Sequence, residues 1–185
     1  MPKSIAVIVG SLRRDSINRQ FAQALTKLPA ARDVVFHFPE IGDLPLYNQD
    51  DDAAPPAQAT RLKSEIRAAD AVIFVTPEYN RSIPGVLKNA LDHASRPYGD
   101  SAWAGKPAAV IGTAHGAIGT AMAQQHLRNI IAYLDMPTLN APEVYIQWKD
   151  DLVGPDGTIG EASASYLDGW MANFLALVAR HSAAG

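Results

Sequence analysis

Short apolar runs alternate with segments of helical periodicity along the whole chain. The apolar runs lie at residues 5–9, 34–38, 71–76, 107–113 and 144–146, the last with Trp148 just beyond it. Between and after them, apolar residues recur every three or four positions at residues 17–28, 62–69, 86–94, 122–134 and 166–178. Runs of four to eight apolar residues indicate buried strands, and the three-to-four spacing indicates amphipathic helices. The pattern predicts an α/β fold.

Strands that alternate with helices form a parallel sheet through right-handed crossovers, with helices on both faces. We therefore expect one domain over residues 1–185, with a doubly wound five-stranded parallel sheet in the order 2-1-3-4-5. In this order, ligands bind beyond the carboxyl ends of the first and third strands, where the strand order reverses. The loops that follow these two strands are the first places to look for a site.

The loop after the first strand is rich in groups that bind phosphate. It reads G-S-L-R-R-D-S-I-N at residues 10–18 and leads directly into a helical pattern. Backbone N–H groups at a helix N-terminus attract anions, and guanidinium groups match phosphate oxygens. We expect a phosphate ester here, and an ordinary turn with Ser16 as N-cap and two solvated arginines is the alternative.

Two further loops have a similar place in the pattern. Residues 77–85 follow the third strand, with Ser82 as a predicted N-cap and Pro84 in the first turn of the next helix. Residues 114–119 follow the fourth strand and contain two glycines, which allow a ligand to approach the backbone closely. The loops after the first and third strands should flank one crevice.

Residues 40–56 form a long segment without apolar periodicity. It holds several prolines and three consecutive aspartates at residues 50–52. A loop of this length in a compact domain covers a site or contacts a partner, and the sequence does not distinguish the two. Consecutive carboxylates do not converge on one ion, so we interpret the aspartates as solvated.

Composition excludes several classes of function. The 185 residues are 48% hydrophobic and 19% charged with a formal net charge of −3, which gives no basic signature for nucleic acid or a membrane surface. The absence of cysteine excludes disulfides, a catalytic thiol and thiolate metal sites. The histidines show no ligand spacing, Gly105-Lys106 is followed by proline, and G-x-S-x-G is absent. We expect a cytoplasmic protein without a metal site, a P-loop or a serine nucleophile.

Two motifs together carry a resemblance to a known family. They are G-S-L-R-x-x-S-x-N at residues 10–18 and P-E-Y-N-x-S-x-P-G-x-L-K-N-x-L-D at residues 77–92, and the similarity continues through residues 113–128. The chain resembles the NADPH-dependent FMN reductase family, whose members include bacterial quinone and chromate reductases. The resemblance implies a flavodoxin-like fold that binds FMN.

The same resemblance implies the residues of the cofactor site. Those expected near the ribityl phosphate are Ser11, Arg13, Ser16, Ile17 and Asn18. Those expected along the isoalloxazine, largely through backbone groups, are Pro77, Glu78, Tyr79, Asn80 and Ser82, with Thr113 and Gly116 completing the pocket. A flavin needs a phosphate cradle at one end and hydrogen-bond donors along its ring, and the cofactor itself supplies the chemistry.

The resemblance further implies an NAD(P)H-dependent oxidoreductase that works by a ping-pong mechanism. NAD(P)H passes hydride to the flavin and leaves, and an acceptor then takes the electrons, with no catalytic side chain required. Arg81 and Arg96 are candidates for holding the phosphates of NAD(P)H, although exposed arginines are often only solvated. The Tyr79 ring either stacks on a bound ring or packs against neighbouring apolar side chains. His115 either lies near the acceptor site or is a solvated surface group.

The sequence leaves the acceptor, the electron donor and the oligomeric state open. The acceptor could be a quinone, a free flavin, an azo or nitro compound, chromate or a ferric complex, and the preference for NADH or NADPH is not fixed. A flavodoxin-type electron carrier, which passes electrons to protein partners, is the main alternative, and a module without flavin is a third. The resemblance and the apolar helix faces lead us to expect a homodimer or homotetramer.

Overall fold

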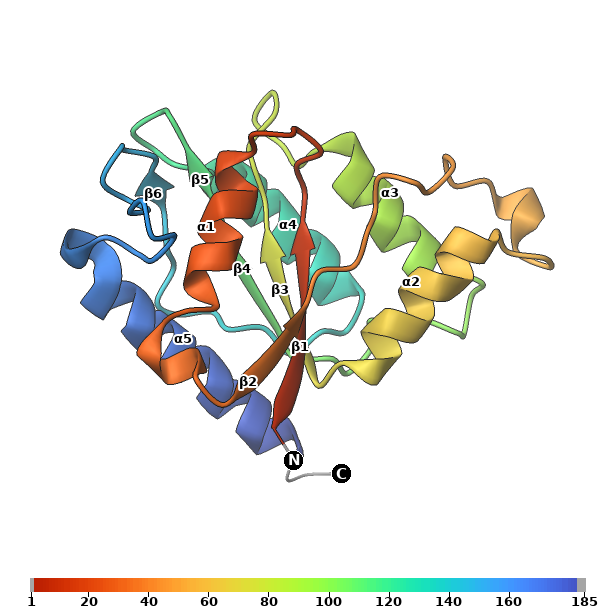
Figure 1. Ribbon diagram of the computed structural model, residues 1–185. Helices are drawn as coiled ribbons and strands as arrows, with labels where there is room; N and C mark the ends of the chain where they lie inside the picture. Colours follow the sequence, from red (N-terminus) through yellow and green to blue (C-terminus); the bar gives the residue numbers. More distant parts are fainter. Residues whose placement is uncertain (1, 183–185) are drawn as a thin grey trace.

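Four parallel strands form the central sheet of the computed structural model, which describes residues 2–182. They are β1 (Lys3–Val9), β2 (Val34–His37), β3 (Ala71–Val75) and β4 (Ala108–Ile111), and their order is β2-β1-β3-β4. The arrows of β1 and β3 point to the end of the molecule where the connecting loops gather (Figure 1). The predicted fold class and the first four places in the strand order are confirmed.

Within residues 2–182, five α-helices surround this sheet. They are α1 (Ile17–Leu25), α2 (Ala57–Ala68), α3 (Gly85–Ala94), α4 (Ala121–Tyr133) and α5 (Glu161–Ser182), and two 3-10 helices, η1 (Pro29–Ala31) and η2 (Gln49–Asp51), lie in the connections. Each α-helix lies where the periodicity predicts one. Among residues 2–182, no helix is both long enough and apolar enough to cross a membrane.

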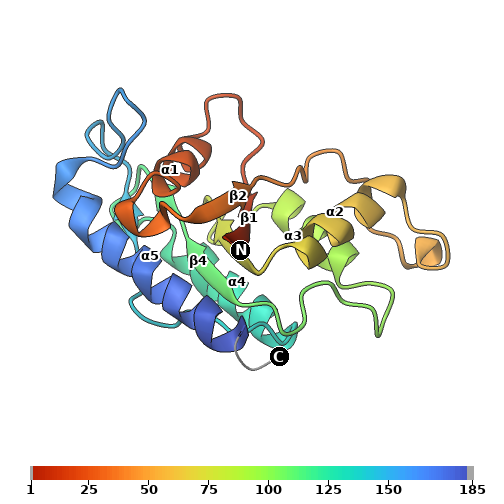
Figure 2. The same cartoon turned by 60° about the horizontal axis from the view of Figure 1, so that its bottom comes forward.

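The helices cover both faces of the sheet, because successive residues of a strand point to opposite sides. Ile5 and Val7 of β1 belong to a core with α1 and α5. Ala6 and Ile8 belong to a second core with α2, α3 and α4. Figure 2 shows α1 and α5 on one side of the strands and α2 and α3 on the other. This double burial explains why β1 and β3 are continuous apolar runs.

The prediction of a fifth strand in the same sheet is wrong. The sequence pattern predicts that residues 144–146 extend the sheet next to the fourth strand, but the pairing in the structure is divided into two short pieces. Ala108 pairs with Thr138 in an isolated bridge, and β5 (Thr113–Ala114) pairs in parallel with β6 (Ile146–Gln147) as a separate two-stranded sheet.

Gly112 marks the break between β4 and β5. A Cβ at Gly112 would lie 2.1 Å from the Thr76 carbonyl oxygen and 2.6 Å from Thr120 Oγ1, so the backbone is pressed against its neighbours here. The facing segment contains Pro137 and Pro142, which have no N–H to donate to a ladder. Because of the close approach at Gly112 and the missing donors, the pairing is limited to the Ala108–Thr138 bridge and the β5–β6 pair.

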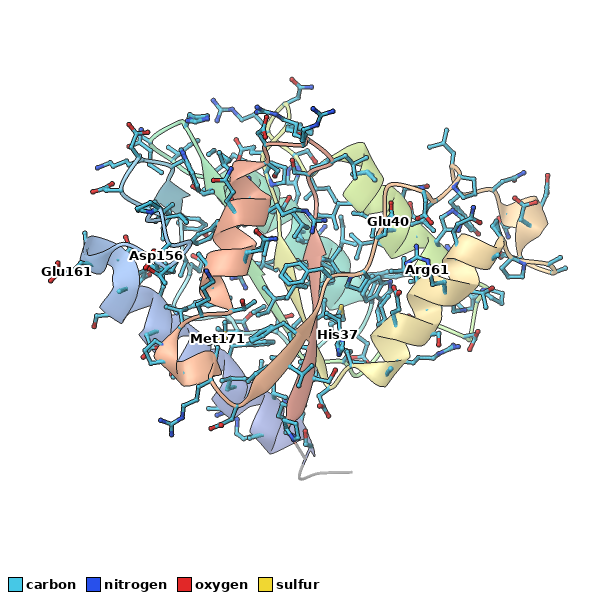
Figure 3. All side chains as sticks on the ribbon, in the orientation of Figure 1. His37, Glu40, Arg61, Asp156, Glu161 and Met171 are labelled. Atoms are coloured by element: carbon cyan, nitrogen blue, oxygen red, sulfur yellow. The ribbon has the colours of Figure 1, made fainter. Side chains whose placement is uncertain are left out.

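The long segment at residues 40–56 is fastened to α2 and α3. Arg61 of α2 donates to the Glu40 carbonyl and to the Asp43 carboxylate, both at 2.9 Å. Glu40 and Arg61 accordingly lie side by side in Figure 3. Asn89 Nδ2 of α3 donates to the Pro45 carbonyl at 2.8 Å. The loop therefore has defined anchor points although it lacks regular structure beyond η2.

The break at Gly112 generates a test of stability. Gly112→Ala should lower the free energy of unfolding by about 1–3 kcal/mol, because the new methyl group overlaps backbone that cannot move aside. Gly85→Ala is the matched control, since its Cβ meets nothing within 4 Å at the start of α3. The control should be neutral or more stable by up to about 1 kcal/mol. Urea unfolding measures both, and similar effects of the two changes would contradict this account of the break.

Candidate functional site

The loops predicted to share a crevice lie side by side. β1 and β3 are hydrogen-bonded neighbours, and the Gly10 N–H continues their ladder by donating to the Val75 carbonyl at 2.9 Å. A Cβ at Gly10 would lie 3.3 Å from Pro77 Cδ and 3.3 Å from Leu87 Cδ2, so the two loops begin in contact. β2 lies on the other side of β1, so the strand order reverses here. This is where open α/β sheets bind ligands.

The loop after β1 presents unused backbone donors. Among residues 2–182, no group accepts a hydrogen bond from the backbone N–H groups of residues 11–15. Ser16 is the N-cap of α1, and its hydroxyl accepts from the Arg19 N–H at 3.2 Å. Ser11 is buried, whereas Arg13 is exposed. Consecutive free amides before a helix form an anion site, and a guanidinium can close over it.

Asn18 joins this loop to the third one. Its side-chain Nδ2 donates to the Thr113 carbonyl at 2.9 Å, and its Oδ1 accepts from the Thr113 N–H at 3.0 Å. The Thr113 hydroxyl donates to the Ile146 carbonyl at 3.0 Å. These buried bonds fix the start of α1 against the β5–β6 pair. Two residues predicted at the cofactor site therefore hold its walls together.

The loop after β3 forms a tight hairpin. The Tyr79 N–H donates to the Ser82 carbonyl and the Ser82 N–H to the Tyr79 carbonyl, both at 3.0 Å. Between them, Asn80 (φ 51°) and Arg81 (φ 65°) both adopt the left-handed conformation. Two successive left-handed residues define a type I′ turn, which costs an arginine about 1–2 kcal/mol. In the described part of the chain, no group accepts from the N–H groups of Glu78, Asn80 and Arg81.

The Glu78 side chain connects the hairpin to α4. Its Oε2 accepts from the Met122 N–H at 3.0 Å and from the Ala123 N–H at 3.1 Å. Its Oε1 accepts from Arg81 Nη1 at 3.1 Å, and the Glu78 side chain is 9% exposed while that of Arg81 is 70% exposed. Thr120, the N-cap residue of α4, makes no side-chain cap. Glu78 therefore caps the N-terminus of α4.

The prediction that Ser82 caps α3 is wrong. Pro84 is the N-cap residue of that helix, and Ser82 instead pairs with His126 of α4 through Oγ and Nδ1 at 3.0 Å. Ser82 cannot cap α3, since it pairs with Tyr79 across the turn and so belongs to the hairpin.

The loop after β5 lies beside these two loops and is open. His115 is exposed, and its carbonyl accepts from Gln147 Nε2 at 2.8 Å. A Cβ at Gly116 meets nothing within 4 Å. Tyr145 precedes β6, and burial is the main cause that raises the pKa of its phenol. The loop thus offers space and backbone groups near the crevice.

The structure separates the two arginines predicted to bind substrate. Arg81 lies in the hairpin, but Arg96 lies beyond the far end of α3, a helix of ten residues that spans roughly 15 Å. There Arg96 sits over the Tyr98 ring at 5.6 Å, and its carbonyl accepts from the buried Lys63 Nζ. Of these two arginines, Arg81 is the one that lies at the loops of the crevice in a single chain.

Two contacts of the site were not predicted from the sequence. The bond between the Glu78 side chain and α4 and the bond between Ser82 and His126 each span 44 residues. A glutamate within a loop gives no local signal that it caps a helix elsewhere in the chain.

Comparison with known proteins gives one consistent result. Residues 4–150 match the family model described as NADPH-dependent FMN reductase. The chain is 54% identical to a 2-hydroxy-1,4-benzoquinone reductase from Burkholderia sp. over 96% of this chain and 97% of that protein. It is 48% identical to a quinone reductase from Pseudomonas putida over 95% of this chain and 94% of that protein.

A solved structure agrees with these relatives. The flavoenzyme FerB, an NAD(P)H:(acceptor) oxidoreductase from Paracoccus denitrificans, superimposes with a TM-score of 0.92 at 46% identity, covering 97% of this chain and 98% of that one.

Proposed function

Since the chain belongs to the NADPH-dependent FMN reductase family, we propose that it reduces quinones with electrons from NAD(P)H through a bound FMN. The observation that carries the proposal is the contact between the loops after β1 and β3, both of which present unused backbone N–H groups. One loop suits a phosphate and the other suits the polar edge of a flat ring. A flavin mononucleotide has both features.

The residues present fit FMN. The amides of residues 11–15, the Ser11 hydroxyl and the Arg13 guanidinium would hold the phosphate at the start of α1, with Ser16 and Ile17 forming the first turn. The amides of Glu78, Asn80 and Arg81 would face the ring, and Gly116 leaves space beside it. Asn18 and Thr113 fix the start of α1 against the β5–β6 pair, from which the loop with Gly116 begins. Bound FMN would supply the transfer of hydride from NAD(P)H and onward to the acceptor.

The chain's own residues would bind and orient the substrates. Tyr79 is half-exposed at the hairpin, where its ring offers a flat apolar surface to a nicotinamide or a quinone. The exposed guanidinium of Arg81 would attract the phosphates of NAD(P)H. Hydride transfer itself requires no side chain as an acid or base.

We also propose that the chain forms a homo-oligomer of at least two copies. Four of the exposed large apolar side chains lie on the loops at the carboxyl end of the sheet and at the start of α4, namely Leu12, Tyr79, Ile118 and Met122. Exposed apolar groups that gather at one end of a protein are typical of an interface. Multi-angle light scattering should give at least twice the chain mass of 19.8 kDa, and a monomer at micromolar concentration would contradict the proposal.

The phosphate cradle is tested by comparing FMN with riboflavin, which lacks the phosphate. Arg13→Ala should weaken FMN binding by about 10- to 100-fold, the value of one hydrogen bond to a charged group, and leave riboflavin binding unchanged. Quenching of flavin fluorescence during titration of apoprotein measures both affinities. Arg32→Ala is the matched control, because the Arg32 side chain is 82% exposed and lies just before β2, at the amino end of the sheet and away from the crevice. Equal loss for both flavins would place the phosphate elsewhere.

Anaerobic mixing with NADPH distinguishes a reductase from an electron carrier. The reductase should lose its yellow absorbance within seconds and recover it when 1,4-benzoquinone is added. An electron carrier would stay yellow until a separate reductase is supplied, and a protein without flavin would be colourless and take up no FMN. Repeating the experiment with NADH, chromate and ferric chelates defines the donor and the range of acceptors.

A further inference from the structure

We infer that the Glu78 carboxylate is a positioning group that holds the hairpin at residues 79–82 in the conformation that receives the flavin ring, an inference that rests on the proposed function. Both carboxylate oxygens are used, one by the first-turn amides of α4 and the other by Arg81 of the hairpin. The side chain is nearly buried and does not face solvent. Glu78 therefore joins an element of the scaffold to the loop that binds the ring.

The carboxylate suits this place electrostatically. The N-terminus of α4 carries a partial positive charge from its aligned peptide groups, and its first N–H groups need acceptors. Helices usually obtain such an acceptor from a residue next to them in sequence, but Thr120 does not provide one. Glu78 provides it from 44 residues away. The cap of α4 is thus at the same time an anchor for the loop after β3.

The hairpin needs an anchor because its sequence suits its conformation poorly. A type I′ turn favours Asn followed by Gly, and this chain has Asn80 followed by Arg81 at φ 65°. The ion pair between Arg81 and Glu78 and the bond between Ser82 and His126 tie both sides of the turn to neighbouring structure. Without the carboxylate, the turn should open and the amides of Asn80 and Arg81 should lose their direction.

If the anchor compensates for an unfavourable turn sequence, a favourable turn sequence should make it unnecessary. Arg81→Gly turns the pair into the Asn-Gly sequence that a type I′ turn favours, so the turn should then keep its shape unaided. A role for Glu78 as a helix cap alone predicts the opposite, since a change in the turn cannot supply an acceptor to α4. The two explanations therefore predict different FMN affinities for the double variant of Glu78→Gln and Arg81→Gly.

The test measures FMN affinity of apoprotein for Glu78→Gln, for Arg81→Gly and for the double variant. Glu78→Gln should weaken FMN binding about tenfold, and the double variant should recover to within roughly threefold of the wild type. An unchanged affinity in Glu78→Gln overturns the inference. So does a weakened affinity that Arg81→Gly fails to restore. If Glu78→Gln does not fold, Glu78→Asp replaces it, because it keeps the charge but is too short to reach both partners.

A second readout needs no flavin. Arg81 is a trypsin site inside the hairpin, so cleavage after Arg81 in apoprotein, followed by mass spectrometry, reports how often the turn opens. Cleavage should be roughly tenfold faster in Glu78→Gln than in the wild type, at equal cleavage after the exposed Arg32. Equal cleavage after Arg81 overturns the inference. If the wild type binds no FMN, the proposed function fails, whereas faster cleavage after Arg81 would still show that Glu78 holds the hairpin.

Discussion

The buried pair of hydrogen bonds between the Asn18 side chain and the Thr113 backbone is the constraint on which the arrangement of the site depends. Asn18 stands in the first turn of α1, and Thr113 follows the break between β4 and β5. An amide side chain is suited to this task because it donates and accepts at once, and so satisfies both polar groups of one residue. Each group would be costly if it were buried without a partner. The pair thereby sets where the start of α1 lies relative to the short β5–β6 sheet.

The N-termini of α1 and α4, which both lie near the crevice, differ in whether their backbone N–H groups have acceptors. The amides before α1 have no acceptor among the described residues, whereas those at the start of α4 are taken by Glu78. Both ends carry the same partial positive charge. Of these two, the start of α1 is therefore available to an anionic group, while the start of α4 is already capped by Glu78. This difference favours the start of α1 over that of α4 as the place of the phosphate in the proposed complex.

Long side chains fix the loops on the face of the sheet that α2 and α3 cover. Arg61 and Asn89 fasten the segment at residues 40–56 to α2 and α3, and the buried Lys63 donates to the Arg96 carbonyl and to the Asp100 carboxylate. The hydrogen bond from Lys63 is the main cause that lowers the pKa of Asp100. Charged groups thus order segments that contain too few apolar residues to bury. The same anchoring keeps Arg96 at the far end of α3 from the hairpin.

The sequence by itself determined the strands β1 to β4, the five helices, the strand order near the site and the two loops that meet there. Each of these follows from periodicity and from turn residues, which are local properties, together with the handedness of parallel crossovers. Only the tertiary structure decided that the fifth strand is divided at Gly112, that Ser82 belongs to the hairpin and not to α3, and that Glu78 caps α4. The bonds from Glu78 to α4 and from Ser82 to His126 connect residues about 44 positions apart, and the pairing of β5 with β6 connects residues 33 positions apart. Whether such groups meet depends on how whole elements pack, and no local pattern of residues records that.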